Sequence, residues 1–136
     1  MNSIKERYSI IPQMEHYDRF TVDYEPYSMF FNKKNFKSEV VNTDELGFRL
    51  NYFNNKKFSL EQLTNFDDIS IVIGGSTVFG FGSTNDKNTI SSLLSKIKNK
   101  VFINFGATAF NSKQEIILFM KYFTKFKKID KVIIVS

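Results

Sequence analysis

One serine of the sequence follows an apolar run at a place where enzymes often carry a nucleophile. The segment 69–82 reads ISIVIGGSTVFGFG, and it begins with the mainly β-branched residues typical of a strand buried on both faces. Gly74 and Gly75 then allow a sharp turn, and Ser76 comes next. Because ligands gather at the carboxyl ends of strands in open parallel sheets, the Ser76 hydroxyl would face a bound substrate. The segment also allows a second interpretation, a glycine-rich turn with an incidental serine.

Three well-known motifs are approached in this segment, and none is complete. A Walker loop requires a lysine after its second glycine, and Phe81 stands at that position. The glycines of segment 74–82 do not complete the G-x-G-x-x-G pattern of dinucleotide-binding proteins. The G-x-S-x-G elbow of α/β-hydrolases starts at Gly74, but Val78 replaces its last glycine. The sequence therefore argues against a phosphate- or nucleotide-binding loop at this turn.

A second loop offers a backbone donor. The segment 104–112 reads NFGATAFNS and follows another apolar run. Gly106 lies just past the end of that run, where a bare backbone N–H group could face a reacting oxygen. If both runs are neighbouring parallel strands, Gly106 and Ser76 lie at the same edge of the sheet.

Alternating strands and helices would position these two loops. Apolar runs predict strands at 69–73, 101–105 and 132–135. Helical spacing predicts helices at 89–98 and from 112 onward, with Asn88 or Thr89 as the first N-cap and a capping box of Ser112 and Glu115 in the second. We expect the apolar residues of both helices to face the sheet, namely Ile90, Leu93, Leu94, Ile97, Ile116, Ile117, Met120, Tyr122, Phe123 and Phe126. This order is typical of an α/β fold with a parallel sheet.

Residues 1–65 show no sustained helical or strand period. Their pattern predicts short extended pieces around a turn at Asp44 and Glu45, a polar loop at 54–57 and one helical turn at 59–63. We interpret residues 1–65 as an N-terminal lead-in that packs on the sheet, and residues 66–136 as the first βαβαβ part of the domain. The lead-in holds His16, the only histidine, and a lone histidine without cysteines argues against a transition-metal site.

The composition limits the classes of function. A chain of 136 residues with 42% hydrophobic residues can bury the core of one domain. The net charge of +5 comes from lysines spread along the chain, which indicates a solvated surface and no nucleic-acid site. The absence of cysteine excludes disulfides and fits a reducing compartment. We expect a cytoplasmic protein without a membrane span, a secretory signal, a metal or an organic cofactor.

Three blocks, in order and at characteristic spacing, resemble the SGNH (GDSL-like) hydrolase family. They are VIGGSTVFGFG at 72–82, INFGATAFNSKQE at 103–115 and KIDKVIIVS at 128–136. Upstream, VNTDELGFRLN at 41–51 is similar to an N-x-x-G-F-R segment of many bacterial members, and Pro26 and Tyr27 match a proline–aromatic pair. The resemblance implies a flavodoxin-like, three-layer α/β fold in which Ser76 is the nucleophile. It also implies that the amides of Ser76 and Gly106 line the oxyanion hole, with Asn104 two residues before that glycine.

The resemblance covers only the amino-terminal portion of the family pattern. The G-x-N-D block would start directly after Ser136, and the D-x-x-H block that supplies the base does not occur; His16 lies too far upstream to replace it. The implied reaction is ester hydrolysis or acyl transfer on O-acyl groups of carbohydrates, lipids or small esters. Because a serine without a base is a poor nucleophile, we expect negligible esterase activity from this chain alone.

An alternative function belongs to another class. The chain could be a non-catalytic binding or assembly module that retains half of the fold. The family sheet has five strands, so an incomplete sheet of three strands would leave an apolar edge uncovered. In this alternative, a second copy of the chain or another partner covers that edge.

Overall fold

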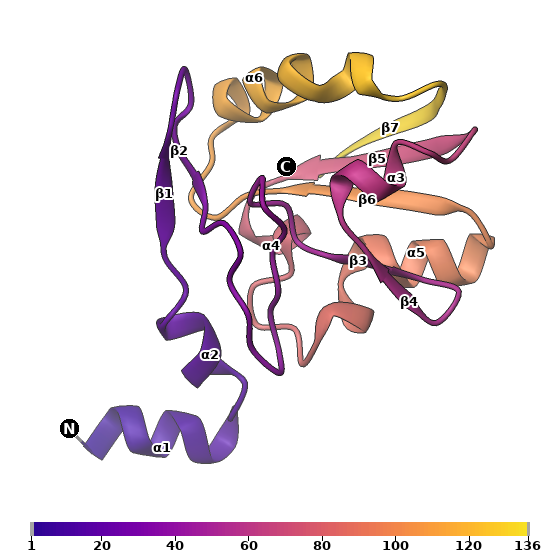
Figure 1. Ribbon diagram of the computed structural model, residues 1–136. Coiled ribbons are helices and arrows are strands. Elements are labelled where there is room, and N and C mark those ends of the chain that lie inside the picture. Colours follow the sequence, from indigo (N-terminus) through magenta and orange to yellow (C-terminus); the bar gives the residue numbers. More distant parts are fainter. Residues whose placement is uncertain (1, 136) are drawn as a thin grey trace.

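The computed structural model describes residues 2–135 and shows a mixed α/β structure built around one parallel sheet (Figure 1). This sheet consists of β5 (Ile69–Gly74), β6 (Val101–Gly106) and β7 (Ile129–Val135), in the order β6-β5-β7. Both neighbours pair with β5 in parallel. The three strands and their parallel pairing, as predicted from the apolar runs, are confirmed.

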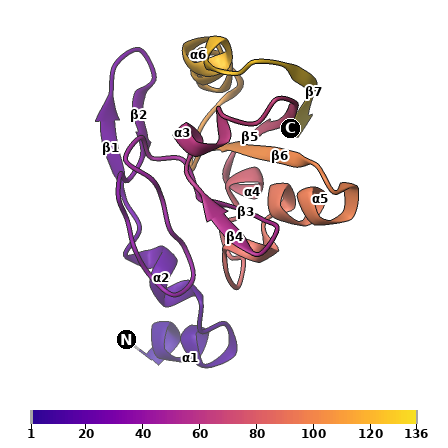
Figure 2. The ribbon, with the colours of Figure 1, turned by 45° about the vertical axis from the view of Figure 1, so that its right-hand side comes forward.

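Helices cover both faces of this sheet. Helix α6 (Ser112–Tyr122) lies on one face, and α4 (Ser76–Phe79) and α5 (Ile90–Lys98) lie on the other (Figures 1 and 2). Thr89 caps α5 through its side chain, which accepts a hydrogen bond from the Ser92 N–H, as the sequence predicted. Short 3-10 turns, η1 (Asp86–Asn88) and η2 (Phe123–Lys125), precede α5 and follow α6. The strands and helices of this half therefore alternate along the chain as expected.

The first half of the chain is more regular than its sequence pattern indicates. It forms three helices and two antiparallel hairpins: α1 (Asn2–Ile10), α2 (Met14–Asp18), β1 (Val22–Glu25), β2 (Met29–Asn32), β3 (Asn51–Phe53), β4 (Lys56–Phe58) and α3 (Leu60–Leu63). The helical turn at α3 was predicted, and Ser59 and Gln62 form a capping box there. Helices α1 and α2 and the β1–β2 hairpin were missed, because their aromatic and charged residues follow no simple period.

The main core lies between the sheet and α6. It combines alternate residues of the strands, such as Ile71 and Ile103, with Leu118 of α6. Phe31 and Phe48 of the first half belong to the same cluster, and the two rings lie 5.1 Å apart. Burial of each such side chain contributes about 1.5–3 kcal/mol to folding. The first half of the chain is thus part of the core that supports the sheet.

The prediction for the buried face of α5 is wrong in part. Leu93 and Ile97 are 42% and 73% exposed, whereas Ser91, Ser92 and Ser95 are buried. The serine hydroxyls explain this orientation. Ser95 Oγ accepts a hydrogen bond from the Phe102 N–H at 2.9 Å, and Ser92 Oγ accepts one from the Tyr52 N–H at 3.1 Å. Small polar side chains thus let α5 approach the strands closely and satisfy their backbone groups.

Helix α6 also turns a different face to the sheet. Ile116, Met120 and Phe123 were expected to face the core, but they are exposed. Tyr122 and Phe126 are buried as expected, and Gln114 and Leu118 are buried in addition. The capping box is formed by Asn111 and Gln114, one residue before the predicted pair of Ser112 and Glu115. The Gln114 side chain also donates to the Ser28 carbonyl at 2.8 Å, which fixes this polar residue inside.

The two edges of the parallel sheet differ. At β6, the side chain of Asn51 accepts a hydrogen bond from the Asn104 N–H at 3.0 Å and donates one to the Phe102 carbonyl, so this edge is satisfied. Within residues 2–135, no strand pairs with the outer edge of β7. Val132 and Ile134 of β7 are 41% and 70% exposed. One edge of the sheet is therefore closed by an asparagine, and the other is open and apolar.

A buried carboxylate attaches the β1–β2 hairpin to the rest of the fold. Glu25 of β1 is 7% exposed and forms ion pairs with Lys121 of α6 and with Lys34. Burial by itself raises the pKa of Glu25, but the hydrogen bonds from both ammonium groups outweigh it and hold the pKa below the ordinary value of glutamate.

This depressed pKa predicts how the stability depends on pH. The ion pairs of Glu25 stabilise the fold above the unfolded-state pKa of about 4.3, and this contribution is lost as the pH falls through the lower pKa of the folded state. We expect Glu25→Gln to lower the free energy of unfolding at pH 7 and to have a smaller effect near pH 3, measured by denaturant unfolding. Glu39→Gln, at an exposed glutamate, is the control and should have little effect at either pH. An equal loss at both pH values for Glu25→Gln would contradict the ion-pair explanation.

Candidate active site around Ser76

Ser76 lies at the carboxyl end of the central strand. It is the first residue of α4 and follows β5 directly, with Gly75 as the N-cap (Figure 1). The residue is exposed, and within residues 2–135 no hydrogen bond occupies its hydroxyl group. The sequence placed Ser76 at the end of a strand, and the structure has it there. It also shows that a short helix, and not an open loop, begins at this residue.

Close backbone contacts hold α4 against the ends of the strands. A Cβ atom on Gly106 would overlap the backbone nitrogen of Phe79, and one on Gly74 would lie 2.7 Å from the Val135 carbonyl oxygen. Neither position has room for a side chain. Gly106 therefore lets the backbone of α4 rest directly on the sheet, and Gly74 makes room for the Val78 side chain of α4 and for β7; these contacts set the position of Ser76.

Gly106 was expected to offer its N–H group to an oxyanion, and the structure also gives this residue a role in packing. Its N–H group donates a hydrogen bond to Asn104 Oδ1 at 2.8 Å. The Asn104 side chain in turn donates to the carbonyl of Val78 in α4 at 2.9 Å. Gly106 and Asn104 thus lie beside the turn of Ser76, as their order in the sequence suggested. However, the Gly106 N–H already has an acceptor, whereas the Ser76 N–H is at the start of a helix and has none within that helix.

The loop after β6 passes next to the same turn and carries backbone strain. Ala109 has φ 59°, a left-handed conformation that is uncommon for residues other than glycine. A Cβ atom on Gly75 would be 3.7 Å from the Phe110 carbonyl oxygen, so this loop is in reach of the candidate nucleophile. The Thr108 N–H donates to Asn32 Oδ1 at 3.0 Å, which anchors the loop to the β1–β2 hairpin. Strained backbone of this kind is frequent beside functional sites.

Within residues 2–135, no histidine or acidic side chain is hydrogen-bonded to the Ser76 hydroxyl. His16 lies on α2 and is half-buried, and no hydrogen bond joins its side chain to Ser76. Helix α2 instead lies against the loop after α4, where Gln13 Nε2 donates to the Gly82 carbonyl at 3.1 Å. Across residues 2–135, no group of histidine, cysteine or acidic side chains could hold a metal ion.

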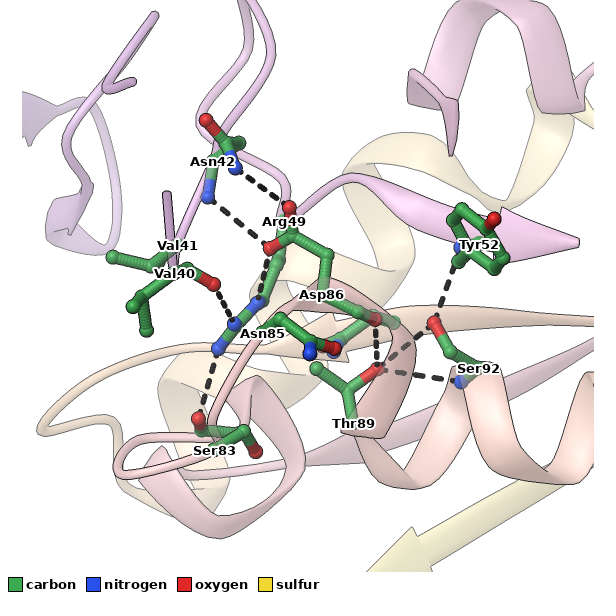
Figure 3. A network of polar contacts seen from close by, with 12 residues as sticks. Val40, Val41, Asn42, Arg49, Tyr52, Ser83, Asn85, Asp86, Thr89 and Ser92 are labelled. Carbon is green, nitrogen blue, oxygen red and sulfur yellow. Dashed lines mark hydrogen bonds and ion pairs between the residues drawn. The ribbon is translucent and has the colours of Figure 1, made fainter. Parts of the chain in front are cut away.

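A buried charge network behind α4 was not foreseen. Arg49 and Asp86 are 2% and 1% exposed, and Arg49 Nε donates to Asp86 Oδ1 at 3.0 Å (Figure 3). Asn42 donates to the same carboxylate through its backbone and its side chain, and Lys57 Nζ lies 3.1 Å from Asp86 Oδ2. The only signal in the sequence was the G-F-R segment that contains Arg49. Asp86 showed none, because its partner is 37 residues away.

Tyr17 joins this network to the turn. Its hydroxyl accepts a hydrogen bond from Arg49 Nη1 and lies 2.9 Å from the Gly80 carbonyl oxygen. Burial raises the pKa of the Tyr17 hydroxyl, so the group keeps its proton at neutral pH and can donate to that carbonyl.

A groove on the described surface lies away from Ser76. It has a volume of about 460 Å³ and runs between the β3–β4 turn and α5, with Tyr52, Lys87 and Lys96 among its lining residues. Ser76 lines neither this groove nor two shallower hollows beside α3. These three hollows therefore do not include the exposed Ser76.

The comparisons with known proteins leave the family open. The sequence matches no protein-family model and no curated protein sequence. The resemblance to SGNH hydrolases accordingly stays a proposal. Among residues 2–135, none of the helices has the length and apolar character needed to cross a membrane.

The contact between Gly106 and α4 can be tested with a matched pair of variants. Gly106→Ala places a methyl group into the backbone of Phe79 and should lower the free energy of unfolding by about 3 kcal/mol. Gly75→Ala places the same group at ordinary contact distance and should change stability by no more than about 0.5 kcal/mol. Denaturant unfolding measures both. Equal effects of the two substitutions would show that α4 does not rest on Gly106.

Proposed function

We propose that Ser76 is the nucleophile of an ester-hydrolysis or acyl-transfer site of the SGNH type, in a flavodoxin-like α/β domain. The observation that carries the proposal is the exposed Ser76 hydroxyl on the first residue of a short helix, at the carboxyl end of the central strand. Ligands of parallel α/β sheets bind at this edge. The fixed backbone of α4 and the strained loop at Ala109 support the same assignment.

The chemistry follows from these groups. Ser76 Oγ attacks the carbonyl carbon of an O-acyl group on a carbohydrate, a lipid or a small ester. A base takes the hydroxyl proton, the alcohol leaves, and the acyl group stays on Ser76 until water or a second alcohol removes it. In this proposal the Ser76 N–H donates to the developing oxyanion, and Gly106 joins it only if Asn104 releases the Gly106 N–H.

The missing base determines how the proposal is tested. A serine hydroxyl without a base is a weak nucleophile, so the isolated chain should turn over esters slowly. Imidazole in solution can serve as the base. We expect a fluorophosphonate ester to label Ser76, with loss of fluoride, and imidazole to accelerate this labelling by about tenfold or more. Intact mass and peptide mapping measure the rate and the site of labelling.

The neighbouring hydroxyl provides the control. Thr77 is also exposed, so Thr77→Ala should keep the labelling, whereas Ser76→Ala should abolish it. Labelling that is spread over several hydroxyl groups, or that persists in Ser76→Ala, would rule out Ser76 as an activated nucleophile.

The open edge of β7 favours a second candidate function, an assembly module. Its exposed Val132 and Ile134 lie on a strand whose outer backbone groups no other strand pairs with in the described chain. In this alternative, a second copy of the chain covers the edge and extends the sheet.

Light scattering distinguishes this candidate. The module predicts a mass twice that of one chain, which Ile134→Lys should reduce to the monomer mass. Ile97→Lys replaces an isoleucine of similar exposure on α5 and should leave the dimer intact. A monomer at all concentrations would exclude self-association through β7.

A further inference from the structure

We propose that Arg49 is the positioning residue of the Ser76 turn: its guanidinium group holds the carbonyl groups at the end of α4 and thereby fixes the nucleophile at its start. This inference rests on the proposed role of Ser76. Arg49 does not contact the reacting atoms and acts through α4.

The first step is the contact between Arg49 and α4. Arg49 Nη1 lies 2.8 Å from the Gly80 carbonyl oxygen and 3.2 Å from that of Phe79. These are carbonyl groups from the C-terminal end of a helix, which have no partner within the helix. A cation is the most favourable partner for them, because the negative end of the helix dipole lies there.

The second step links this end of the helix to Ser76. Helix α4 has only four residues, far fewer than an isolated helix needs to be stable in water. The N–H groups of Gly80 and Phe81 donate to the Ser76 carbonyl at 3.0 and 2.9 Å. Residues 80 and 81 are therefore bonded directly to the residue that carries the nucleophile. A group that holds Gly80 also holds Ser76.

The third step concerns how Arg49 itself is held. Its guanidinium carbon lies 5.7 Å from the ring centre of Tyr17 and 5.3 Å from that of Phe79. The Nη2 atom donates to the Val40 carbonyl at 2.9 Å, and Nε donates to Asp86. The guanidinium thus contacts two aromatic rings and has hydrogen-bond partners on several sides. Lysine offers a single ammonium group and cannot make these bonds at the same time.

Stability alone does not account for this arrangement. A buried ion pair is often no more stabilising than apolar residues of the same volume, because both charges lose their hydration. The pair of Arg49 and Asp86 does, however, fix directions in space, since each donor has a defined acceptor. The end of α4 at Gly80 and the segment 40–42 both meet at this pair. We therefore attribute the fixed backbone geometry at Ser76 to this pair, because apolar side chains of the same volume have no directional bonds.

Hydrogen exchange provides the first test. In Arg49→Lys, we expect the amide protons of Gly80 and Phe81 to lose protection by about tenfold or more relative to those of β5. Tyr17→Phe removes one hydroxyl group from the same contact and should act in the same direction, with a smaller effect. Lys57→Gln removes a positive charge beside Asp86 without touching α4, and is the matched control. It should leave the exchange of the turn unchanged.

A thiol at position 76 provides the second test. The sequence contains no cysteine, so Ser76→Cys introduces the only thiol of the protein. In the Ser76→Cys variant that keeps Arg49, the N–H groups at the start of α4 should lower the thiol pKa below the free value of about 8.5. Adding Arg49→Lys should move the pH profile of alkylation toward that free value and slow the reaction at pH 7 by about three- to tenfold.

The outcomes separate this inference from the proposed function. Two results in the folded Arg49→Lys variants would together overturn the role of Arg49. The amide protons of Gly80 and Phe81 would change their exchange rates only as much as those of β5, and the pH profile of thiol alkylation would stay unchanged. If Arg49→Lys fails to fold, Tyr17→Phe decides by the same two measurements. Neither measurement depends on ester hydrolysis. A failure of fluorophosphonate labelling would therefore refute the acyl-transfer proposal without affecting the position that Arg49 gives to residue 76.

Discussion

The buried ion pair of Arg49 and Asp86 joins parts of the chain that are far apart in the sequence. A charge can leave water only if it finds a partner and hydrogen bonds, and here they come from separate parts of the chain. Tyr17 and the segment 40–42 contribute from the first half, and Gly80 contributes from the turn after Ser76. Each bond requires its own two segments, so the complete set forms only when all of the segments are in place. This requirement couples the first half of the chain to the sheet more strictly than apolar packing alone would.

The candidate site uses a second constraint, the close contact of backbones at Gly106. Because this position has no room for a side chain, the four-residue helix α4 rests on the ends of β5 and β6. The side chains of Asn104 and Arg49 donate hydrogen bonds to the carbonyl groups at the end of this helix. The position of Ser76 is thus fixed from below by residues that do not face the solvent. The hydroxyl itself stays free, as a nucleophile requires.

The sequence predicted the parts of this structure that depend on local pattern. The apolar runs identified β5, β6 and β7, and the position of Ser76 after its strand was read correctly. The faces of α5 and α6 were misread, since buried serines and Gln114 satisfy backbone groups that only the folded chain brings near. The pair of Arg49 and Asp86 could not be predicted for the same reason. Its partners lie 37 residues apart, and no period or spacing links them.

The open edge of the sheet is formed by the strand next to the one that leads to Ser76. On the β6 side, the loop at 107–110 lies beside Gly75 and is bonded to Asn32 of the β1–β2 hairpin. On the other side, β7 ends next to Gly74, and its apolar edge is exposed. In the proposed function, a second copy of the chain that covers Val132 and Ile134 would lie beside the strand that leads to Ser76. The two candidate functions that we propose, assembly and acyl transfer, would then share one part of the molecule.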